Sequence, residues 1–325
     1  MVRVGIIGAG KNATKHAEYC CENRDRVKVV AIADPDMDRA DRLAKACSAK
    51  PVDEYTKMLP DVDAVFISSP NHFHRSQVIT AAEAGKHIYC EKPVGLSVED
   101  AQAMADAAAA ADVRTLVGFS VRKAGNIRTM ARMAQSGDLG DLLTVVSRRV
   151  FALHRDAETA WRVNPETSGG LLLEVNIHEI DWMMMVAGQV ESVYARLRAD
   201  EKRPRANDHI AVTLNFANGA IGIHEGSWRA PLPSFFRCVY GNRAGLQTDE
   251  WGKGLMLGAL GSDRCEIECD EDLDMRAAFF DSIESGVDCD CNLAYGLEVM
   301  RVTEAIYESS LTNQVVQVAS AAASV

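Results

Sequence analysis

The chain has 325 residues, of which 47% are hydrophobic and 25% are charged. This composition is typical of globular proteins and excludes disordered and fibrous ones. The 46 acidic residues outnumber the 35 basic ones and give a net charge of -11, so the chain lacks the positive footprint that nucleic-acid backbones and anionic membranes require. We therefore expect neither of these partners. A typical domain has about 100–200 residues, so this length predicts two domains.

The nine cysteines have no framework spacing. An odd number of scattered cysteines indicates reduced thiols and a cytoplasmic location. Cys265 with Cys269 and Cys289 with Cys291 lack the spacing of a zinc knuckle and are weak metal candidates. We interpret them instead as small buried hydrophobic side chains. The sequence therefore predicts no metal site. It has no run of about 18 apolar residues, so we also expect no membrane span.

The first third of the chain alternates short apolar runs with segments of helical periodicity. The apolar runs are Val2–Ile7, Val27–Ala33, Ala64–Ser68, His87–Cys90 and Thr115–Gly118. The helical segments are Ala40–Ala46, Ser76–Ala84 and Val98–Ala110. Continuous apolar strands between helices indicate a parallel sheet covered on both faces. We therefore predict an α/β, doubly wound Rossmann domain over residues 1–120.

The remainder of the chain has a different pattern. Its predicted strands are Leu142–Phe151, Val190–Leu197, Ile210–Phe216, Ala220–Trp228 and Phe235–Tyr240. Its predicted helices are Asn126–Gln135, Leu171–Ala187, Leu273–Ile283 and Leu293–Ser309. Strands without helices between them indicate an antiparallel sheet, so residues 121–325 are predicted to form an α+β domain. The helix at about 293–309 is expected to pack back on the first domain.

The strongest motif for function is the pattern G-x-G-x-x-A, which follows the first apolar run and opens a helical segment. The first glycine allows a tight turn, the second lets the backbone approach a pyrophosphate, and the small alanine permits contact between helix and strand. The amides of the helix N-terminus then face the phosphates. The cofactor-binding residues predicted in this turn are Gly8, Gly10, Lys11, Asn12 and Ala13.

Asp34 ends the second apolar run. Its carboxylate lies on the order of 20 residues beyond the glycines, where the ribose-binding acid of a dinucleotide fold is expected. A carboxylate there accepts hydrogen bonds from ribose hydroxyls and repels a 2′-phosphate. This predicts NAD as the cofactor, with NADP as the alternative.

Two further clusters carry chemistry. Lys92 lies in a Glu-Lys-Pro segment at the carboxyl end of a predicted strand, where α/β sheets bind ligands. An exposed loop cation is the alternative interpretation. Glu174, His178 and Asp181 are spaced four and then three apart on one predicted helix, so they share a face and suit general acid–base catalysis. A metal pair or a helix-surface network is the alternative.

Taken in order, these clusters resemble the glucose–fructose oxidoreductase/inositol dehydrogenase (Gfo/Idh/MocA) family over essentially the whole chain. The matching segments are the glycine turn, Ser69-Pro70-Asn71-His72-Phe73-His74, Ala84-Gly85-Lys86-His87 leading into Glu91-Lys92-Pro93, Trp161-Arg162 before Ser168-Gly169-Gly170, and His178 with Asp181. Each segment alone is common, but their order and spacing together are highly specific.

The resemblance implies that residues 121–325 bind substrate and contain a large open antiparallel sheet, through which a homo-oligomer forms, either a dimer or a tetramer. It adds cofactor-binding residues, namely Ser69, Pro70, Asn71, His74, Glu91 and Lys92. It places Lys92 and His178 at the family's catalytic positions and implies a cis Lys92–Pro93 bond. We expect Glu174 to take part in catalysis as well. The expected substrate-binding residues are Lys92, Arg122, Trp161, Arg162, Glu174 and His178, with surface ion pairs as the alternative for Arg122 and Arg162.

Two positions depart from the family's usual pattern. Glu174 stands where aspartate is most frequent, and Asn176 stands where glycine is usual. The longer carboxylate could change which ring hydroxyl is held, so the substrate stays open.

The resemblance implies an NAD(P)-dependent dehydrogenase of a cyclitol, sugar or amino sugar. One alternative is a ketoreductase of a modified or nucleotide-linked sugar that uses NADPH. Another is a dinucleotide-binding regulator without turnover, since such folds also serve as binders. The presence of Lys92 and His178 argues against the regulator, which has no need of them.

Charged segments elsewhere have ordinary interpretations. Arg148, Arg149 and the run Lys202–Arg205 are expected to be short surface or ligand-edge charges. The acidic stretch Cys269–Asp274 lacks the spacing of a calcium loop and is expected to cap the helix that follows.

Overall fold

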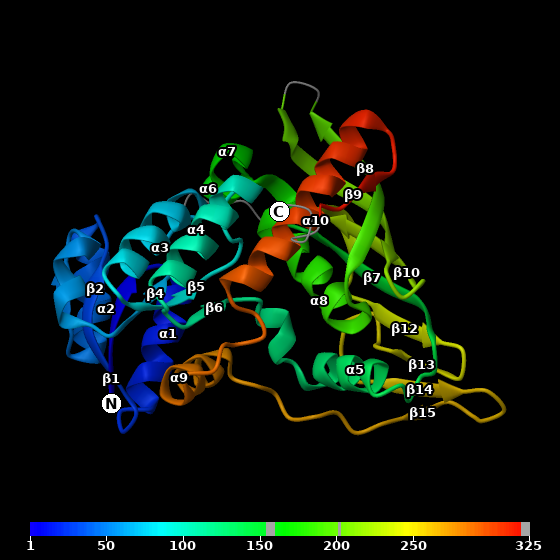
Figure 1. The fold of residues 1–325 in the computed structure, drawn as a ribbon, viewed down its shortest axis with the longest axis horizontal. Helices are drawn as coiled ribbons and strands as arrows, with labels where there is room; N and C mark the ends of the chain where they lie inside the picture. The colour runs from blue at the N-terminus through cyan, green and yellow to red at the C-terminus, as the bar shows by residue number, and fades with distance from the viewer. Residues whose placement is uncertain (154–159, 201–202, 320–325) are drawn as a thin grey trace. The chain divides into compact units, whose positions relative to one another are not determined.

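The computed structural model describes residues 1–153, 160–200 and 203–319, and Figure 1 draws the path of the chain. The chain forms two compact units. The first contains Met1–Gly118 and Asp274–Leu297, and the second contains Phe119–Leu273 and Glu298–Val325. The predicted division assigned all of 121–325 to one domain, whereas the structure groups Asp274–Leu297 with the first unit.

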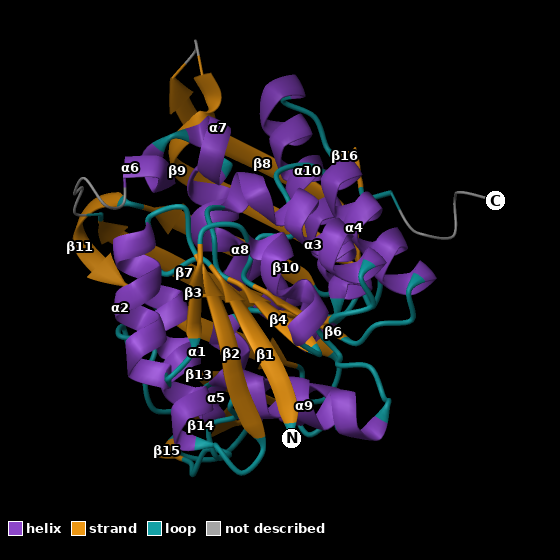
Figure 2. Ribbon diagram, turned by 90° about the vertical axis from the view of Figure 1, so that its left-hand side faces the viewer, coloured by secondary structure: helices purple, strands orange, loops and turns teal. Residues whose placement is uncertain are grey.

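A six-stranded parallel sheet forms the centre of the first unit, with strand order β3-β2-β1-β4-β5-β6. Its strands are β1 (Val2–Ile7), β2 (Val27–Ala33), β3 (Lys50–Val52), β4 (Ala64–Ile67), β5 (His87–Cys90) and β6 (Thr115–Val117). Figure 2 shows β1 and β2 side by side. This is the Rossmann order, which reverses between β1 and β4 and binds ligands at the carboxyl ends of the strands there. The predicted Rossmann sheet is confirmed.

Helices cover this sheet. They are α1 (Lys11–Glu22), α2 (Met37–Cys47), α3 (His74–Glu83), α4 (Val98–Ala110), α9 (Met275–Ser285) and the first residues of α10 (Leu293–Thr312). Phe66 of β4 stacks on His16 of α1 and meets Phe279 and Phe280 of α9 edge-on. The aromatic rings thus join α1 and α9 to the sheet. As expected from the acidic stretch, Asp274 caps α9 by accepting a hydrogen bond from the Arg276 amide.

A ten-stranded sheet forms the second unit, in the order β15-β14-β13-β12-β7-β10-β9-β8-β16, with β11 also paired to β7. Its strands are β7 (Leu142–Ala152), β8 (Val190–Asp200), β9 (Arg203–Phe216), β10 (Ile221–Ser227), β11 (Arg229–Ser234), β12 (Arg237–Gly241), β13 (Ala244–Gln247), β14 (Met256–Ala259), β15 (Cys265–Glu266) and β16 (Val316–Gln317). The predicted antiparallel sheet is confirmed apart from β7 and β10, which run parallel. β10 follows β9 in a hairpin and runs antiparallel to it. In that direction it lies parallel to β7.

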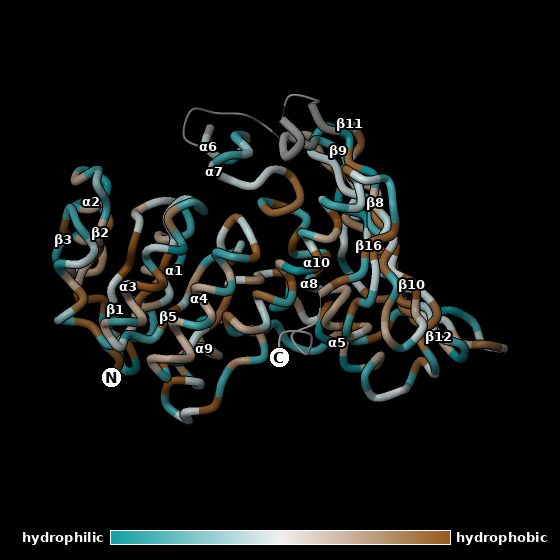
Figure 3. The backbone as a smooth tube through the Cα atoms, turned by 45° about the horizontal axis from the view of Figure 1, so that its top comes forward, coloured by the Kyte–Doolittle hydropathy of each residue, from teal (hydrophilic) through white to brown (hydrophobic). Residues whose placement is uncertain are grey.

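One face of this sheet is covered and the other is exposed. On β10, Gly222 and His224 are buried whereas Ile221 and Ile223 are exposed. Figure 3 shows hydrophobic and hydrophilic segments following one another along the strands of this sheet. The covered face packs against α8 (Ile177–Ala187), which also contacts α5 (Gly125–Gln135). The short helices α6 (Ala160–Val163) and α7 (Pro165–Ser168) precede α8 in the chain.

The predicted helix Leu171–Ala187 is not uniform. Its first turn, Leu172–Asn176, is a π-helix, and α8 begins only at Ile177. Single π-helical turns of this kind often occur at functional sites.

Exposure tests the interpretation of the cysteines as buried side chains. Cys265 is exposed on β15, so its interpretation as a buried hydrophobic side chain is wrong. None of the nine cysteines, all of which lie in the described ranges, forms a disulfide. No helix within those ranges combines the length and apolar character needed to cross a membrane.

Candidate functional site

The glycine turn joins β1 to α1. Gly8 has a φ of 91°, a conformation that strongly favours glycine. A Cβ on Gly8 would lie 3.0 Å from backbone atoms of Ser68 and Ser69. The Gly8 amide donates a 2.8 Å hydrogen bond to the Ala33 carbonyl, which fixes the turn against the end of β2.

The N-terminus of α1 fits the phosphates of a dinucleotide. Gly10 is the N-cap residue and supplies no capping side chain, so the amides of the first turn are not covered by a cap. A Cβ on Gly10 would meet no atom within 4 Å, which leaves open space at the helix end. Ala13 is buried against the sheet, whereas Lys11 is exposed. Uncapped amides and the helix dipole favour an anion at this position.

Asp34 lies beside this turn. One of its carboxylate oxygens accepts a 2.8 Å hydrogen bond from the Ala9 amide, and the other accepts a 2.9 Å bond from the Asp36 amide. The side chain is partly exposed. The carboxylate is therefore fixed next to the glycine turn while keeping access to solvent, as a ribose-binding acid requires.

His74 connects the loops that follow β4 and β5. Its Nδ1 lies 3.0 Å from the Pro93 carbonyl oxygen, and its Nε2 lies 3.0 Å from the Ser69 carbonyl oxygen. The side chain has no exposed surface, and this burial lowers the pKa of His74. His74 thus holds both loops from within the unit, and its ring nitrogens face backbone carbonyls. The Lys92–Pro93 bond in the second loop is cis, as expected.

The remaining residues of these loops are held by side chains. Asn71 is buried and Pro70 is half-buried. The Ser69 hydroxyl donates a 2.6 Å hydrogen bond to Gln77 Oε1. Lys92 is half-buried at the end of β5.

Glu91 has a partner that the sequence did not predict. His16 Nε2 of α1 lies 3.0 Å from Glu91 Oε1. Burial alone would raise the pKa of Glu91, but this hydrogen bond and the charges of His16 and Lys92 bring it below its ordinary value. A Cβ at Gly118 would lie 3.1 Å from the same carboxylate. His16 lies on the buried face of α1 with no motif around it, so no sequence pattern indicates this contact.

In the second unit, Glu174 and His178 are both nearly buried. Glu174 lies in the π-helical turn, and its Oε1 is 3.3 Å from Arg162 Nε. The Arg162 guanidinium in turn lies over the ring of Trp161, 5.5 Å from its centroid. The structure therefore brings together three of the predicted substrate-binding residues. The ring of His178 meets that of Phe119 edge-on, with centroids 6.4 Å apart.

Asp181 and Arg122 form a buried ion pair. Arg122 Nε and Nη2 donate hydrogen bonds of 2.7–2.9 Å to the Asp181 carboxylate. Asp181 has no exposed surface. This pair joins the 3₁₀ turn Ser120–Lys123 to α8. The alternative interpretation of Arg122 was a surface ion pair. Arg122 does form an ion pair, but its guanidinium is buried, so the predicted surface position is wrong.

A second buried ion pair was not predicted. Glu179 accepts hydrogen bonds from Arg237 at 2.5 and 2.8 Å, from Arg149 at 3.1 Å and from the Ser147 hydroxyl at 2.7 Å. Burial alone would raise the pKa of Glu179, but the two guanidinium groups hold it well below its ordinary range. Arg149, expected as a surface or ligand-edge charge, is half-buried, and its guanidinium reaches a carboxylate with no exposed surface. Arg148 does lie at the surface, paired with Glu225, and Lys202 lies outside the described residues.

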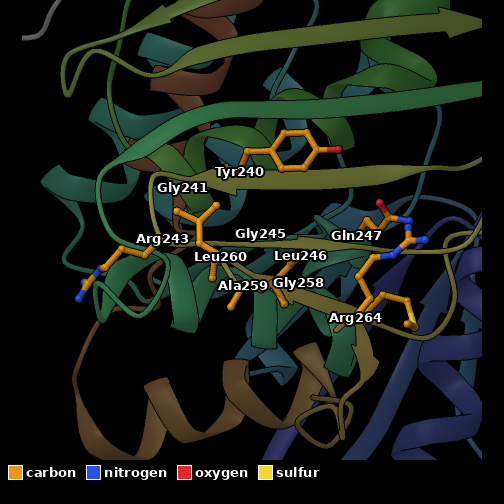
Figure 4. Close-up of a pocket in the computed structure, with 12 residues that line it drawn as sticks. Tyr240, Gly241, Arg243, Gly245, Leu246, Gln247, Gly258, Ala259, Leu260 and Arg264 are labelled. Atoms are coloured by element: carbon orange, nitrogen blue, oxygen red, sulfur yellow. The ribbon is translucent and has the colours of Figure 1, made fainter. Parts of the chain in front are cut away.

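A depression of about 280 Å³ lies elsewhere in the second unit, on β12, β13 and β14. Figure 4 shows Gln247 and Arg264 near one another at one end of it and Arg243 at the other. None of the predicted site residues is among the residues that line it.

Residues 2–119 match the oxidoreductase family with an NAD-binding Rossmann fold, GFO/IDH/MocA, and residues 127–247 match the GFO/IDH/MocA C-terminal domain. The chain belongs to the GFO/IDH/MocA oxidoreductase family. The expected resemblance is confirmed, and NAD binding by the first unit agrees with its glycine turn and with Asp34.

Relatives with established names act on polyols and sugars. Myo-inositol 2-dehydrogenase of Thermotoga maritima is 31% identical over 239 residues, which cover 70% of this chain and 69% of that protein. D-glucoside 3-dehydrogenase of Escherichia coli strain K12 is 36% identical over 203 residues, which cover 60% of this chain and 57% of that protein. The crystal structure of aldose-aldose oxidoreductase from Caulobacter crescentus has a TM-score of 0.87 at 23% identity, covering 97% of this chain and 99% of that one. This structural similarity supports the fold.

Proposed function

We propose that the protein transfers a hydride between nicotinamide and a secondary alcohol, or the matching ketone, of a cyclitol, sugar or amino sugar. The observation that carries the proposal is the turn Gly8–Ala13, which fits a dinucleotide, in a chain that belongs to this oxidoreductase family. The names of the inositol and glucoside dehydrogenases support the substrate class. The ribose-side carboxylate of Asp34 favours NAD over NADP.

Lys92 and His178 are proposed to handle the proton of the reacting hydroxyl group. When bound, NAD supplies the carbon that accepts the hydride. A protonated lysine donates a hydrogen bond to the alcohol oxygen and stabilises its developing negative charge. A neutral histidine accepts the hydroxyl proton. Either residue can be the formal base, so we assign the proton transfer to the two together.

The other proposed roles concern substrate orientation. Glu174 is proposed to accept hydrogen bonds from ring hydroxyls, since its carboxylate is held by Arg162 in the π-helical turn. Trp161 and Arg162 contact each other beside it. Arg122 is proposed to act on the substrate from its ion pair with Asp181.

The test is a panel of inositols, aldoses, glycosides and amino sugars, each supplied with NAD or NADP and followed by the absorbance of the reduced nicotinamide. We expect oxidation of at least one member of the panel with NAD and slower oxidation with NADP. Activity only as reduction of modified or nucleotide-linked ketosugars with NADPH would replace the proposal by the ketoreductase alternative. Tight NAD binding with no turnover would replace it by the regulator.

Variants of the two proposed catalytic residues test their roles. Lys92→Met and His178→Ala are each expected to lower turnover by about 10²–10⁴-fold, the usual contribution of a positioned acid or base. NAD affinity, measured by calorimetry, is expected to stay unchanged in His178→Ala, because Gly8–Ala13 and Asp34 lie in the other unit. Turnover near that of the wild type in both variants would remove the assignment.

Assembly into a homo-oligomer is also proposed. It rests on family membership and on the exposed apolar side chains of the open sheet, among them Ile221, Ile223 and Tyr240. Light scattering during size-exclusion chromatography measures the mass directly, and a monomer at micromolar concentration would contradict the proposal.

A further inference from the structure

Buried side chains of the second unit form a continuous series of hydrogen bonds under the sheet. Glu179 of α8 contacts Ser147 of β7 at 2.7 Å, and Ser147 contacts His224 Nδ1 of β10 at 3.2 Å. His224 Nε2 lies 2.8 Å from Asn176 Nδ2 at the end of the π-helical turn. All four residues are buried, with exposed fractions of 0–1%. The series starts at the Glu179 ion pair and ends at the turn that contains Glu174.

The direction of each hydrogen bond in this series is determined. The Glu179 carboxylate can only accept, so the Ser147 hydroxyl donates its one proton to it. Ser147 then accepts from His224 Nδ1–H. Burial lowers the pKa of His224 to about 4, so the ring is neutral near pH 7 and its Nε2 carries a lone pair. That lone pair accepts from the Asn176 amide group.

The space for Asn176 depends on Gly226. A Cβ on residue 226 would lie 2.3 Å from Asn176 Nδ2 and 2.9 Å from its Oδ1. The carboxamide therefore packs directly on the backbone of β10. Its Oδ1 is buried with no hydrogen-bond partner among the residues that the structure describes, which has an energetic cost because the oxygen has lost its hydrogen bonds to water. The retained orientation, in spite of that cost, indicates that the contact with His224 matters.

We propose that Asn176, held by His224 in the space left by Gly226, is a positioning residue that fixes the π-helical turn Leu172–Asn176. The turn carries Glu174, and α8 begins at Ile177, one residue before His178. Asn176 lies two residues from each of these two proposed active groups, so fixing it fixes the segment between them. This inference rests on the proposed function for its activity readout, but not for its structural one.

Two substitutions of His224 each keep a different hydrogen bond of the series and remove the other. In His224→Gln, the side-chain oxygen reaches the place of Nε2 and still accepts from Asn176. In His224→Asn, the shorter amide reaches the place of Nδ1, so it donates to Ser147 and leaves Asn176 without its acceptor. The two variants are matched in chemistry and differ in the bond that they keep.

The experiment measures turnover, KM and the hydrogen–deuterium exchange of the peptide that covers 172–178. For His224→Asn and Asn176→Gly we expect turnover to fall by about 10–10²-fold, as displacement by about an ångström does at active sites. The exchange of that peptide should become faster, and the KM for NAD should not change. His224→Gln should retain most of the turnover and the wild-type exchange of the peptide.

Equal losses in His224→Asn and His224→Gln would overturn the proposal, since the bond to Asn176 would then not matter. Wild-type turnover in Asn176→Gly would overturn it as well. The double variant Asn176→Gly with Gly226→Ala refills part of the space without the hydrogen bond, and full recovery there would show that Asn176 serves only as volume. If the wild type turns over no member of the panel, the proposed function fails, and the exchange of residues 172–178 in the same variants still decides the positioning role.

Discussion

The turn Gly8–Ala13 and the turn Leu172–Asn176 hold functional groups in place by different means. In the first, the backbone itself supplies the binding groups, and its shape follows from a φ of 91° at Gly8 and from an uncapped helix end. In the second, side chains support the turn from β7 and β10, and Ser147 and His224 are 77 residues apart in the chain. A backbone site can be specified by a few neighbouring residues, whereas the second site depends on contacts between distant strands and is sensitive to each partner.

The largest effect is expected when the buried ion pair of Glu179 is broken. Glu179→Gln leaves the guanidinium groups of Arg149 and Arg237 facing a neutral amide in a buried place. Removing one partner of a buried pair costs about 3–5 kcal/mol, and we expect that loss in the free energy of unfolding measured with urea. The matched control is Glu225→Gln on β10, whose ion pair with Arg148 is exposed and should contribute about 0–1 kcal/mol. Similar losses in the two variants would contradict this difference between buried and exposed pairs.

The pH dependence of stability tests the buried support of the turn Leu172–Asn176 through His224. The unfolded chain protonates His224 near its ordinary pKa of 6.5, whereas burial holds the folded pKa at about 4. As the pH falls from 6.5 to 4, the unfolded state takes up a proton that the folded state does not, so stability is lost by up to about 3 kcal/mol. Burial also lowers the pKa of His74 and His87, so the comparison must be with His224→Gln. The variant should lose less stability than the wild type over this range, and parallel curves would contradict the assignment to His224.

For the glycine turn, the test separates backbone strain from binding. Gly8→Ala is expected to lower the free energy of unfolding by about 1–2 kcal/mol, the cost of a left-handed conformation for alanine, and to weaken NAD binding because its Cβ meets Ser68 and Ser69. Gly85→Ala is the control, since Gly85 has a φ of 70° and a Cβ there meets nothing within 4 Å. That variant should show the strain alone and bind NAD normally. Weakened NAD binding in Gly85→Ala would show that the effect at Gly8 is not specific to the turn.

The same comparison explains what could be predicted from sequence. The Rossmann sheet, the glycine turn and Asp34 follow from periodicity and from spacing within about 30 residues, so local patterns are enough for them. The ends of β1, β2 and β5 agree with the predicted runs for this reason. The strand β3 was missed because it has only three residues and contains Pro51.

The support of the second turn could not be predicted in this way. Glu179 and His224 belong to no motif, and their partners become neighbours only when β7, β10 and α8 pack together. The sequence predicts ordinary helix at the π-helical turn, because an extra residue in one turn leaves the apolar pattern nearly unchanged. Asn176 did give a signal, as a residue that departs from the usual glycine, but only the structure shows that Gly226 opposite leaves space for it.

The smallest effect is expected for the N-cap of α2, which is a contact between neighbouring residues. Asp36 caps α2 by accepting hydrogen bonds from the amides of Asp38 and Arg39. Replacing such a cap with alanine costs about 1 kcal/mol, and we expect that loss in urea unfolding of Asp36→Ala. Asp38→Ala removes an acidic residue from the same first turn without removing the cap, so its loss should be a fraction of that. Because Asp36 also supplies the amide that binds Asp34, unchanged NAD affinity in Asp36→Ala is expected, since the backbone donor remains. A large fall in affinity would mean that side chains support the cofactor turn too, and that the two turns are less different than their contacts indicate.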